Sequence, residues 1–173
     1  MDPKRIVAEG YDAISERYLA WSDLRPSPTR LRYLALALDL IPAGSDVLDL
    51  GCGAGIPMTA ALAEGRTVTG VDISETQLEM ARRNVPGATF LQADMTTLTF
   101  EPASFDAVVA FYSLTHVPRD EQAELLGRIR SWLRPGGLFL ASMGADDEPG
   151  DVEPEDRHDA RFLWVVARAP SDG

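Results

Sequence analysis

The chain has 173 residues, 45% of them hydrophobic, so it can bury one core but is too short for two comfortable domains. Sixteen Lys and Arg against 27 Asp and Glu leave a net charge of -11, which repels nucleic-acid phosphates and anionic lipid surfaces. With one cysteine, no leader pattern and no long apolar run, we expect one cytoplasmic domain without disulfide, nucleic-acid or membrane partners.

The N-terminal 42 residues predict helices. Residues 4–21 carry apolar side chains near helical spacing, although a glycine weakens the middle of this segment. Residues 29–40 are apolar around most of the helix circumference, which is typical of a helix that packs on a sheet.

Short apolar runs, bounded by Gly, Pro or Asp, then alternate with helix-like stretches. Ser74 is the expected cap of one helix, and Pro135 with Gly136 is the expected end of another. This alternation predicts an α/β fold with a doubly wound, mostly parallel sheet of about six strands. The expected strands are 46–50, 67–73, 88–93, 105–112, 137–142 and 162–168, with helices over 57–64, 75–84 and 120–133.

The whole chain, 1–173, therefore reads as a single domain. Its expected parts are N-terminal helices over 1–42, a ligand-binding core over 46–143, an acidic linker over 144–161 and a final strand over 162–168.

The stretch "VLDLGCGAG" places Gly51, Gly53 and Gly55 directly after the first expected strand. In such sheets ligands bind beyond the carboxyl ends of the strands, and glycines there allow a tight turn and a close approach of the backbone. A dinucleotide fingerprint would need Gly or Ala at position 56, which is Ile56. Asp49 would repel a pyrophosphate by roughly 1 kcal/mol at about 4 Å in water. The loop therefore favours a ligand with a cationic end.

With this loop and the motifs that follow it, the chain resembles the class I S-adenosylmethionine-dependent methyltransferases over roughly residues 6–150. "VLDLGCGAG" is similar to the family's first motif, which lies beneath the methionine and ribose parts of the cofactor. "GVDIS" (70–74) is similar to the second, so the resemblance implies that Asp72 accepts hydrogen bonds from both ribose hydroxyls. Ile73, beside it, is a candidate adenine contact as well as an ordinary core residue.

"QADM" (92–95) is similar to the third motif of the family. The resemblance implies that Asp94 accepts the adenine amino group and that Met95 meets the ring, although Asp94 could equally begin a turn. "FDAVVAFYSLTHV" and "LRPGGLFLAS" are similar to the motifs of strands 4 and 5, and we add Phe111 to the expected cofactor contacts. Cys52, among the glycines, has no basic partner in the sequence and is interpreted as a small filler, still within the cofactor loop.

Methyl transfer depends mainly on alignment, and only an acceptor that arrives protonated needs a base. His116, four residues beyond Tyr112, is the one candidate base, with a local structural role as the alternative. The resemblance adds that an N-terminal helix often closes over the methionine end. Tyr11 and Tyr18, at i and i+7, are therefore expected at the cofactor, and Tyr18 also at the transferring methyl. No metal site is expected.

Three functions remain open from the sequence. The first is a methyltransferase that uses S-adenosylmethionine and acts on a small molecule. The second is a scaffold that binds the cofactor without catalysis, and the third is an NAD-dependent oxidoreductase.

The residues after the fifth strand bear on the second alternative. Members of the resembled family continue into a further helix and strand before an antiparallel final strand, whereas here the acidic segment leads almost directly to "FLWVVAR" (162–168). We expect the sheet to close with that antiparallel strand, the C-terminal part to be short, and one sheet face to be under-covered. Weak methyl transfer and a homodimer through that face would follow.

Overall fold

The computed structural model describes Ile6, Gly10 and residues 28–144, 152–154 and 161–171. Tyr11, Tyr18 and most of the acidic segment lie outside the described residues, so the expectations placed on them stay predictions. None of the helices in the described ranges is long and apolar enough to cross a membrane.

One sheet organises the described chain, with strand order β3-β2-β1-β4-β5-β7-β6. Strands β1 to β5 pair in parallel, and β7 pairs antiparallel with both β5 and β6. The predicted doubly wound sheet with an antiparallel last strand is confirmed. The strands are β1 (Asp46–Leu50), β2 (Thr67–Asp72), β3 (Thr89–Gln92), β4 (Phe105–Ala110), β5 (Leu133–Gly144), β6 (Val152–Pro154) and β7 (Arg161–Arg168).

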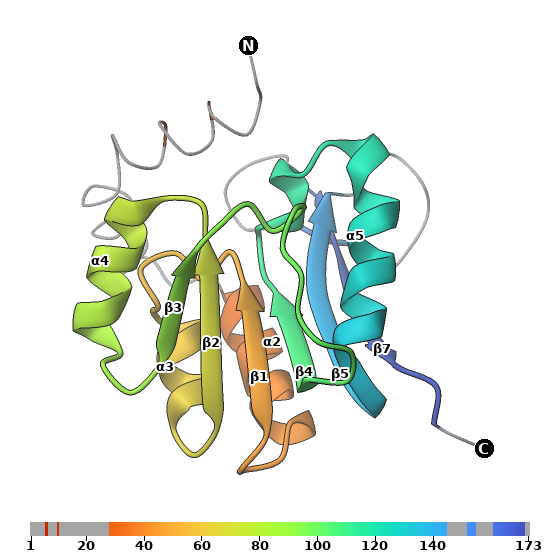
Figure 1. The fold of residues 1–173 in the computed structure, drawn as a ribbon, viewed down its shortest axis with the longest axis horizontal. Helices are drawn as coiled ribbons and strands as arrows, with labels where there is room; N and C mark the ends of the chain where they lie inside the picture. Colours follow the sequence, from red (N-terminus) through yellow and green to blue (C-terminus); the bar gives the residue numbers. More distant parts are fainter. Residues whose placement is uncertain (1–5, 7–9, 11–27, 145–151, 155–160, 172–173) are drawn as a thin grey trace.

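Helices cover both faces of this sheet (Figure 1). Side chains of α2 and α3 pack with Val47, Val68 and Val109 on one face, and side chains of α5 pack with Leu48, Leu50 and Val108 on the other. Residues that alternate along a strand therefore enter different cores, which explains why β1 is apolar on both faces. The helices whose bounds lie in the described residues from 28 onward are α2 (Pro28–Leu40), α3 (Met58–Ala63), α4 (Glu75–Asn84), the 3-10 turn η1 (Leu114–His116) and α5 (Arg119–Trp132).

Most predicted elements differ from the structure by one or two residues at their ends, and two further details differ by more. The first is a seventh strand, β6, which lies within the segment expected to be a linker and pairs with β7. The second is the start of β5, which follows α5 directly because Leu133 already pairs with Phe105. Pro135 and Gly136 then fall in an irregularity of the strand, where Gly136 has a φ of +76°. They do not form a separate closing turn.

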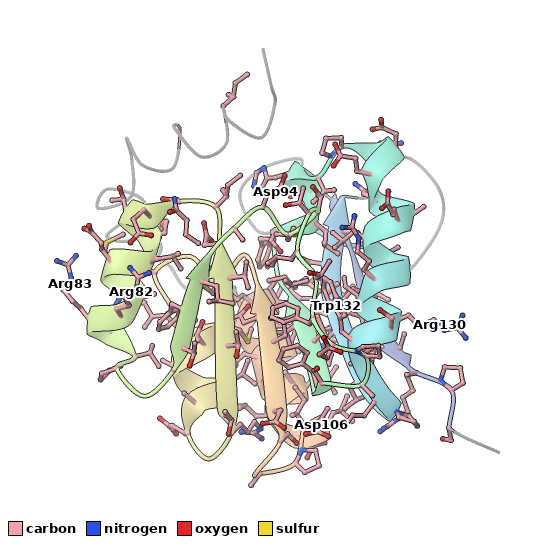
Figure 2. The ribbon with its side chains drawn as sticks, in the orientation of Figure 1. Arg82, Arg83, Asp94, Asp106, Arg130 and Trp132 are labelled. Carbon is pink, nitrogen blue, oxygen red and sulfur yellow. The ribbon has the colours of Figure 1, made fainter. Side chains whose placement is uncertain are left out.

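The order of the strands determines where a ligand can enter. Strand β1 has β2 on one side and β4 on the other. From β1 the chain runs to β2 and β3 on the first side and then crosses to β4 on the second, so the carboxyl ends of β1 and β4 flank a crevice. Figure 2 shows Asp94 at this end of the sheet and Asp106 at the opposite end. Asp106 serves the structure there, because its Oδ2 accepts the Asp46 N–H at 2.8 Å and pairs with Arg134 at 2.7 Å.

Candidate active site

A pocket opens at the carboxyl ends of β1, β2 and β4, bounded by the loops that follow β1 to β4 and by α2. It brings together residues that lie far apart in the chain. Ten of the residues assigned from the sequence line it: Asp49, Gly51, Cys52, Gly53, Asp72, Ile73, Asp94, Met95, Phe111 and His116.

The glycine loop is bent tightly against two neighbouring strands. The N–H groups of Gly51 and Cys52 both donate to the Val71 carbonyl, at 2.7 and 3.0 Å. Gly51 has a φ of +76°, and a Cβ at this position would overlap Cβ of Ser113. Ser113 in turn donates from Oγ to the Leu50 carbonyl at 2.6 Å. The loop after β1 thus requires glycine both for its conformation and for its contact with the loop after β4.

Gly55 has a different role from the other two glycines. It is buried outside the pocket lining, with a φ of +78°, and a Cβ would lie 3.1 Å from Val85 Cγ2 and 3.4 Å from Ala81. Its missing side chain therefore lets the loop pack closely on α4. The sequence does not distinguish this packing role from a ligand contact.

Asp72, at the end of β2, organises the loop and α4 together. Its Oδ2 accepts the Gly53 N–H at 2.9 Å, and its Oδ1 accepts the Ser74 N–H at 3.0 Å. Ser74 caps α4 as predicted, since its Oγ accepts the Gln77 N–H at 3.1 Å. The carboxylate is consequently held at the pocket wall by two backbone donors.

Asp49 is 2% exposed, and its Oδ2 accepts from the Thr59 hydroxyl at 2.6 Å. Burial raises the pKa of Asp49 to about 6, with a contribution from the Asp72 charge and against the effect of the Thr59 hydrogen bond. A cation bound beside this carboxylate would favour its charged form.

Asp49→Asn is expected to stabilise the ligand-free domain at pH 7 by roughly 2 to 3 kcal/mol, because the amide carries no buried charge. In the folded chain the pKa of Asp49 is about 6, above the usual value of 3.8 for this side chain, so the carboxyl keeps its proton to a higher pH than in the unfolded chain. The free energy of unfolding of the wild type should therefore fall as the pH rises from about 4 to about 6.

Urea unfolding at pH 4.5 and pH 7.5 measures this effect. The control is Asp39→Asn, which neutralises an exposed carboxylate on α2. An Asp49→Asn variant no more stable than the wild type at pH 7.5 would contradict the prediction.

Asp94 and Met95 follow β3. Asp94 Oδ1 accepts hydrogen bonds from both the N–H and the hydroxyl of Thr96, each at 2.8 Å, so Asp94 does begin a turn, as the alternative interpretation held. Asp94 also lines the pocket together with Met95, so this turn forms part of the pocket wall.

The two reactive side chains near the loop differ in environment. Cys52 is buried, and burial together with the Asp49 and Asp72 charges raises the pKa of its thiol, which argues against a nucleophilic thiolate. The interpretation of Cys52 as a filler agrees with this. His116, in η1, keeps an exposed surface at the pocket, and desolvation of the rest lowers its pKa despite the Asp72 charge.

Several lining residues were missed by the sequence analysis, above all Arg30, Gln77, Tyr112 and Ser113. Arg30 lies on α2 and its guanidinium is 4.5 Å from the centroid of the Tyr112 ring. The helical pattern of α2 gave no signal for this role. Tyr112 belongs to the quoted strand 4 motif and could have been found there.

Comparison with known proteins shows which family this chain belongs to. Residues 47–137 match the family model described as "Methyltransferase domain", which is more than half of the chain. The chain belongs to the class I S-adenosylmethionine-dependent methyltransferases. S-adenosylmethionine is therefore its family's cofactor, as the resemblance implied.

Two relatives illustrate the similarity of this methyltransferase domain. It is 33% identical over 171 residues to the 27-O-demethylrifamycin SV methyltransferase of Amycolatopsis mediterranei, covering 86% of this chain and 62% of that protein. It is 30% identical over 122 residues to the ubiquinone biosynthesis O-methyltransferase of Coxiella burnetii, covering 68% of this chain and 50% of that protein. The domain thus spans about half to three fifths of the length of these relatives.

A solved structure supports the fold. The 1,6-didemethyltoxoflavin-N1-methyltransferase of Burkholderia thailandensis, solved with 1,6-didemethyltoxoflavin and S-adenosylhomocysteine bound, has a TM-score of 0.75 and 20% identity. The similarity covers 96% of this chain and 88% of that one.

Proposed function

We propose that this domain binds S-adenosylmethionine in the described pocket and transfers its methyl group to a small-molecule acceptor. The observation that carries the proposal is the set of charged side chains in the pocket lining. Asp49, Asp72 and Asp94 come from three neighbouring strand ends, and Arg30 comes from α2. A nucleoside with a zwitterionic amino-acid tail is the ligand that such a set would hold.

Each carboxylate suits one part of that ligand. We assign Asp72 to the ribose hydroxyls and Asp94, with Met95, to the adenine ring, since these residues follow adjacent strands β2 and β3. Gly51 and Gly53 have φ values of +76° and +54° and no side chains, so the backbone of the loop can approach a ligand closely. Ile73 and Phe111 supply apolar surface beside these groups.

The amino-acid tail needs groups of both charges. Asp49 is the buried carboxylate at the loop, and we assign it to the cationic methionine end. Among the described lining residues, Arg30 is the only arginine or lysine, and we assign it to the methionine carboxylate. Tyr11 and Tyr18 remain proposed for the same end of the cofactor.

The bound cofactor would supply an electrophilic methyl group: a lone pair of the acceptor would bond to the methyl carbon while the carbon–sulfur bond breaks and its electron pair stays on sulfur. The protein's part is to hold the two reactants in line and to exclude water. Partial burial lowers the pKa of His116, which favours the neutral imidazole that could accept a proton from a hydroxyl acceptor. We propose His116 as that base and Tyr18 as a second group near the methyl.

A small-molecule acceptor is supported by the relatives, whose names refer to rifamycin, ubiquinone and toxoflavin compounds. The charge of -11 further disfavours nucleic acid. Weak turnover and self-association, expected from the short C-terminal part, stay predictions.

The proposal is tested by calorimetry with S-adenosylhomocysteine and NAD, followed by a labelled-methyl turnover assay over pools of small metabolites. We expect binding of S-adenosylhomocysteine, no binding of NAD and labelling of a small molecule. Binding without labelling of any acceptor would favour a non-catalytic cofactor-binding domain, and binding of NAD alone would overturn the proposal.

Arg30→Gln is expected to weaken S-adenosylhomocysteine binding about tenfold or more, because a charge-assisted pair with the carboxylate contributes roughly 1.5 to 3 kcal/mol. Adenosine, which has no carboxylate, should keep its affinity. Arg32→Gln, an exposed arginine two residues along α2 and outside the described pocket lining, is the control for the change of charge. Equal losses for the two ligands would remove Arg30 from the carboxylate site.

A further inference from the structure

Trp164, on β7, lies at the centre of an aromatic cluster behind the pocket wall. Its ring stacks on Tyr33 of α2, with centroids 3.8 Å apart and planes within 4°. It also meets Phe111 and Tyr112 edge-on, with centroid distances of 5.1 and 5.5 Å. Phe111 and Tyr112 line the pocket, so Trp164 connects the last strand to the wall of the site.

Tyr112 has a backbone conformation that residues other than glycine rarely adopt. Its φ of 61° is in the left-handed region, which costs a non-glycine residue energy and persists only when neighbours enforce it. One such neighbour is Ser142, which is fully buried and accepts the Tyr112 N–H on Oγ at 2.6 Å. Ser142 is the direct partner of Trp164 in the β5–β7 register. This strand pair therefore restrains both the backbone and the ring of Tyr112.

The ring of Tyr112 in turn carries the guanidinium of Arg30, 4.5 Å from its centroid. A cation over an aromatic face is attracted by the negative charge of that face. The contacts thus form a continuous series from Trp164 through Tyr112 to Arg30, and only the last two residues reach the pocket.

We propose that Trp164 is a positioning residue of the cofactor site. It holds the Tyr112 ring, and through that ring it places Arg30 for the methionine carboxylate. The inference rests on the proposed function, because Arg30 has this partner only when the cofactor is bound. It assigns the final antiparallel strand a part in cofactor binding although the strand contributes no described residue to the pocket lining.

The indole of Trp164 makes a conservative variant possible. Its Nε1 is buried and has no hydrogen-bond partner among the described residues. Trp164→Phe consequently keeps an aromatic ring against Tyr112 and breaks no described hydrogen bond. Trp164→Leu removes the ring. Val166→Ala, two residues along the same strand and 46% exposed, is the matched control.

Calorimetry with S-adenosylhomocysteine and with adenosine, on the full chain, tests the inference. Trp164→Leu should bind S-adenosylhomocysteine about tenfold more weakly and should lose clearly less affinity for adenosine. The contact of Trp164 with Phe111 affects both ligands, whereas the placement of Arg30 affects only the ligand that carries a carboxylate. Trp164→Phe should restore most of the lost affinity, and Val166→Ala should match the wild type. A general loss of structure would lower the affinity for both ligands.

Ser142→Ala keeps the inference testable if Trp164→Leu does not fold. It removes the acceptor of the Tyr112 N–H and should produce the same selective loss. Unchanged binding of S-adenosylhomocysteine, or equal losses for both ligands, in a folded variant would overturn the inference alone. A wild type that bound no S-adenosylhomocysteine would instead overturn the proposed function and the inference with it.

Discussion

Gly51→Ala is expected to destabilise the domain by about 4 kcal/mol and to abolish measurable S-adenosylhomocysteine binding. Two costs combine at this position. The left-handed φ of +76° is unfavourable for any residue with a side chain, and the new Cβ would overlap Cβ of Ser113 while lying 3.0 Å from its Oγ. Because Ser113 is bonded to the Leu50 carbonyl, it cannot withdraw without breaking the link between the loops after β1 and β4.

A second glycine separates the two costs. Gly44 has a φ of +82°, but nothing lies within 4 Å of the position where its Cβ would be. Gly44→Ala should therefore lose only about 1 kcal/mol and keep its affinity for S-adenosylhomocysteine. Urea unfolding and calorimetry on both variants measure the difference. If the two variants lost equal stability, the contact with Ser113 would not be the reason for glycine at position 51.

Replacement of Asp72 with Ala is expected to weaken S-adenosylhomocysteine binding by about 100-fold or more. Each hydrogen bond from a ribose hydroxyl to a charged acceptor contributes roughly 1.5 to 3 kcal/mol. The change also removes the acceptor of the Gly53 and Ser74 N–H groups, which lie at 2.9 and 3.0 Å. The loop would then lose the carboxylate that ties it to the start of α4.

Calorimetry with adenosine and 2′,3′-dideoxyadenosine isolates the ribose contribution. The wild type should prefer adenosine, whereas Asp72→Ala should bind both ligands with similar affinity. Asp39→Ala changes the net charge equally at an exposed position of α2 and should behave as the wild type. An unchanged dissociation constant for Asp72→Ala would remove Asp72 from the cofactor site.

The sequence was sufficient for those parts of the fold that depend on local patterns. The strand before the glycine loop, the cap at Ser74 and the helix over 75–84 agree with the structure, since apolar periodicity and capping act over a few residues. The prediction placed the start of β5 too late in the chain and did not contain β6. Both depend on pairing with distant residues, such as Phe105 with Leu133, which no local pattern contains.

The positions of the carboxylates in the site, like the local helices and strands, can be predicted from the sequence. Asp72 and Asp94 occur at the ends of recognisable strands, and the carboxyl ends of parallel strands meet at one edge of the sheet. Their gathering in one pocket could therefore be predicted from the sequence. By itself the sequence thus determined the fold class, the family resemblance and the strand-end side of the site.

Only the tertiary structure decided how the rest of the pocket is made. Arg30, Tyr112 and Trp164 belong to α2, the loop after β4 and β7, and they meet because the sheet order places β7 beside β5. The left-handed backbone of Tyr112 is likewise sustained by Ser142, thirty residues later in the chain. Contacts between residues so far apart carry no periodic signal, because they arise from packing and strand order after the chain has folded.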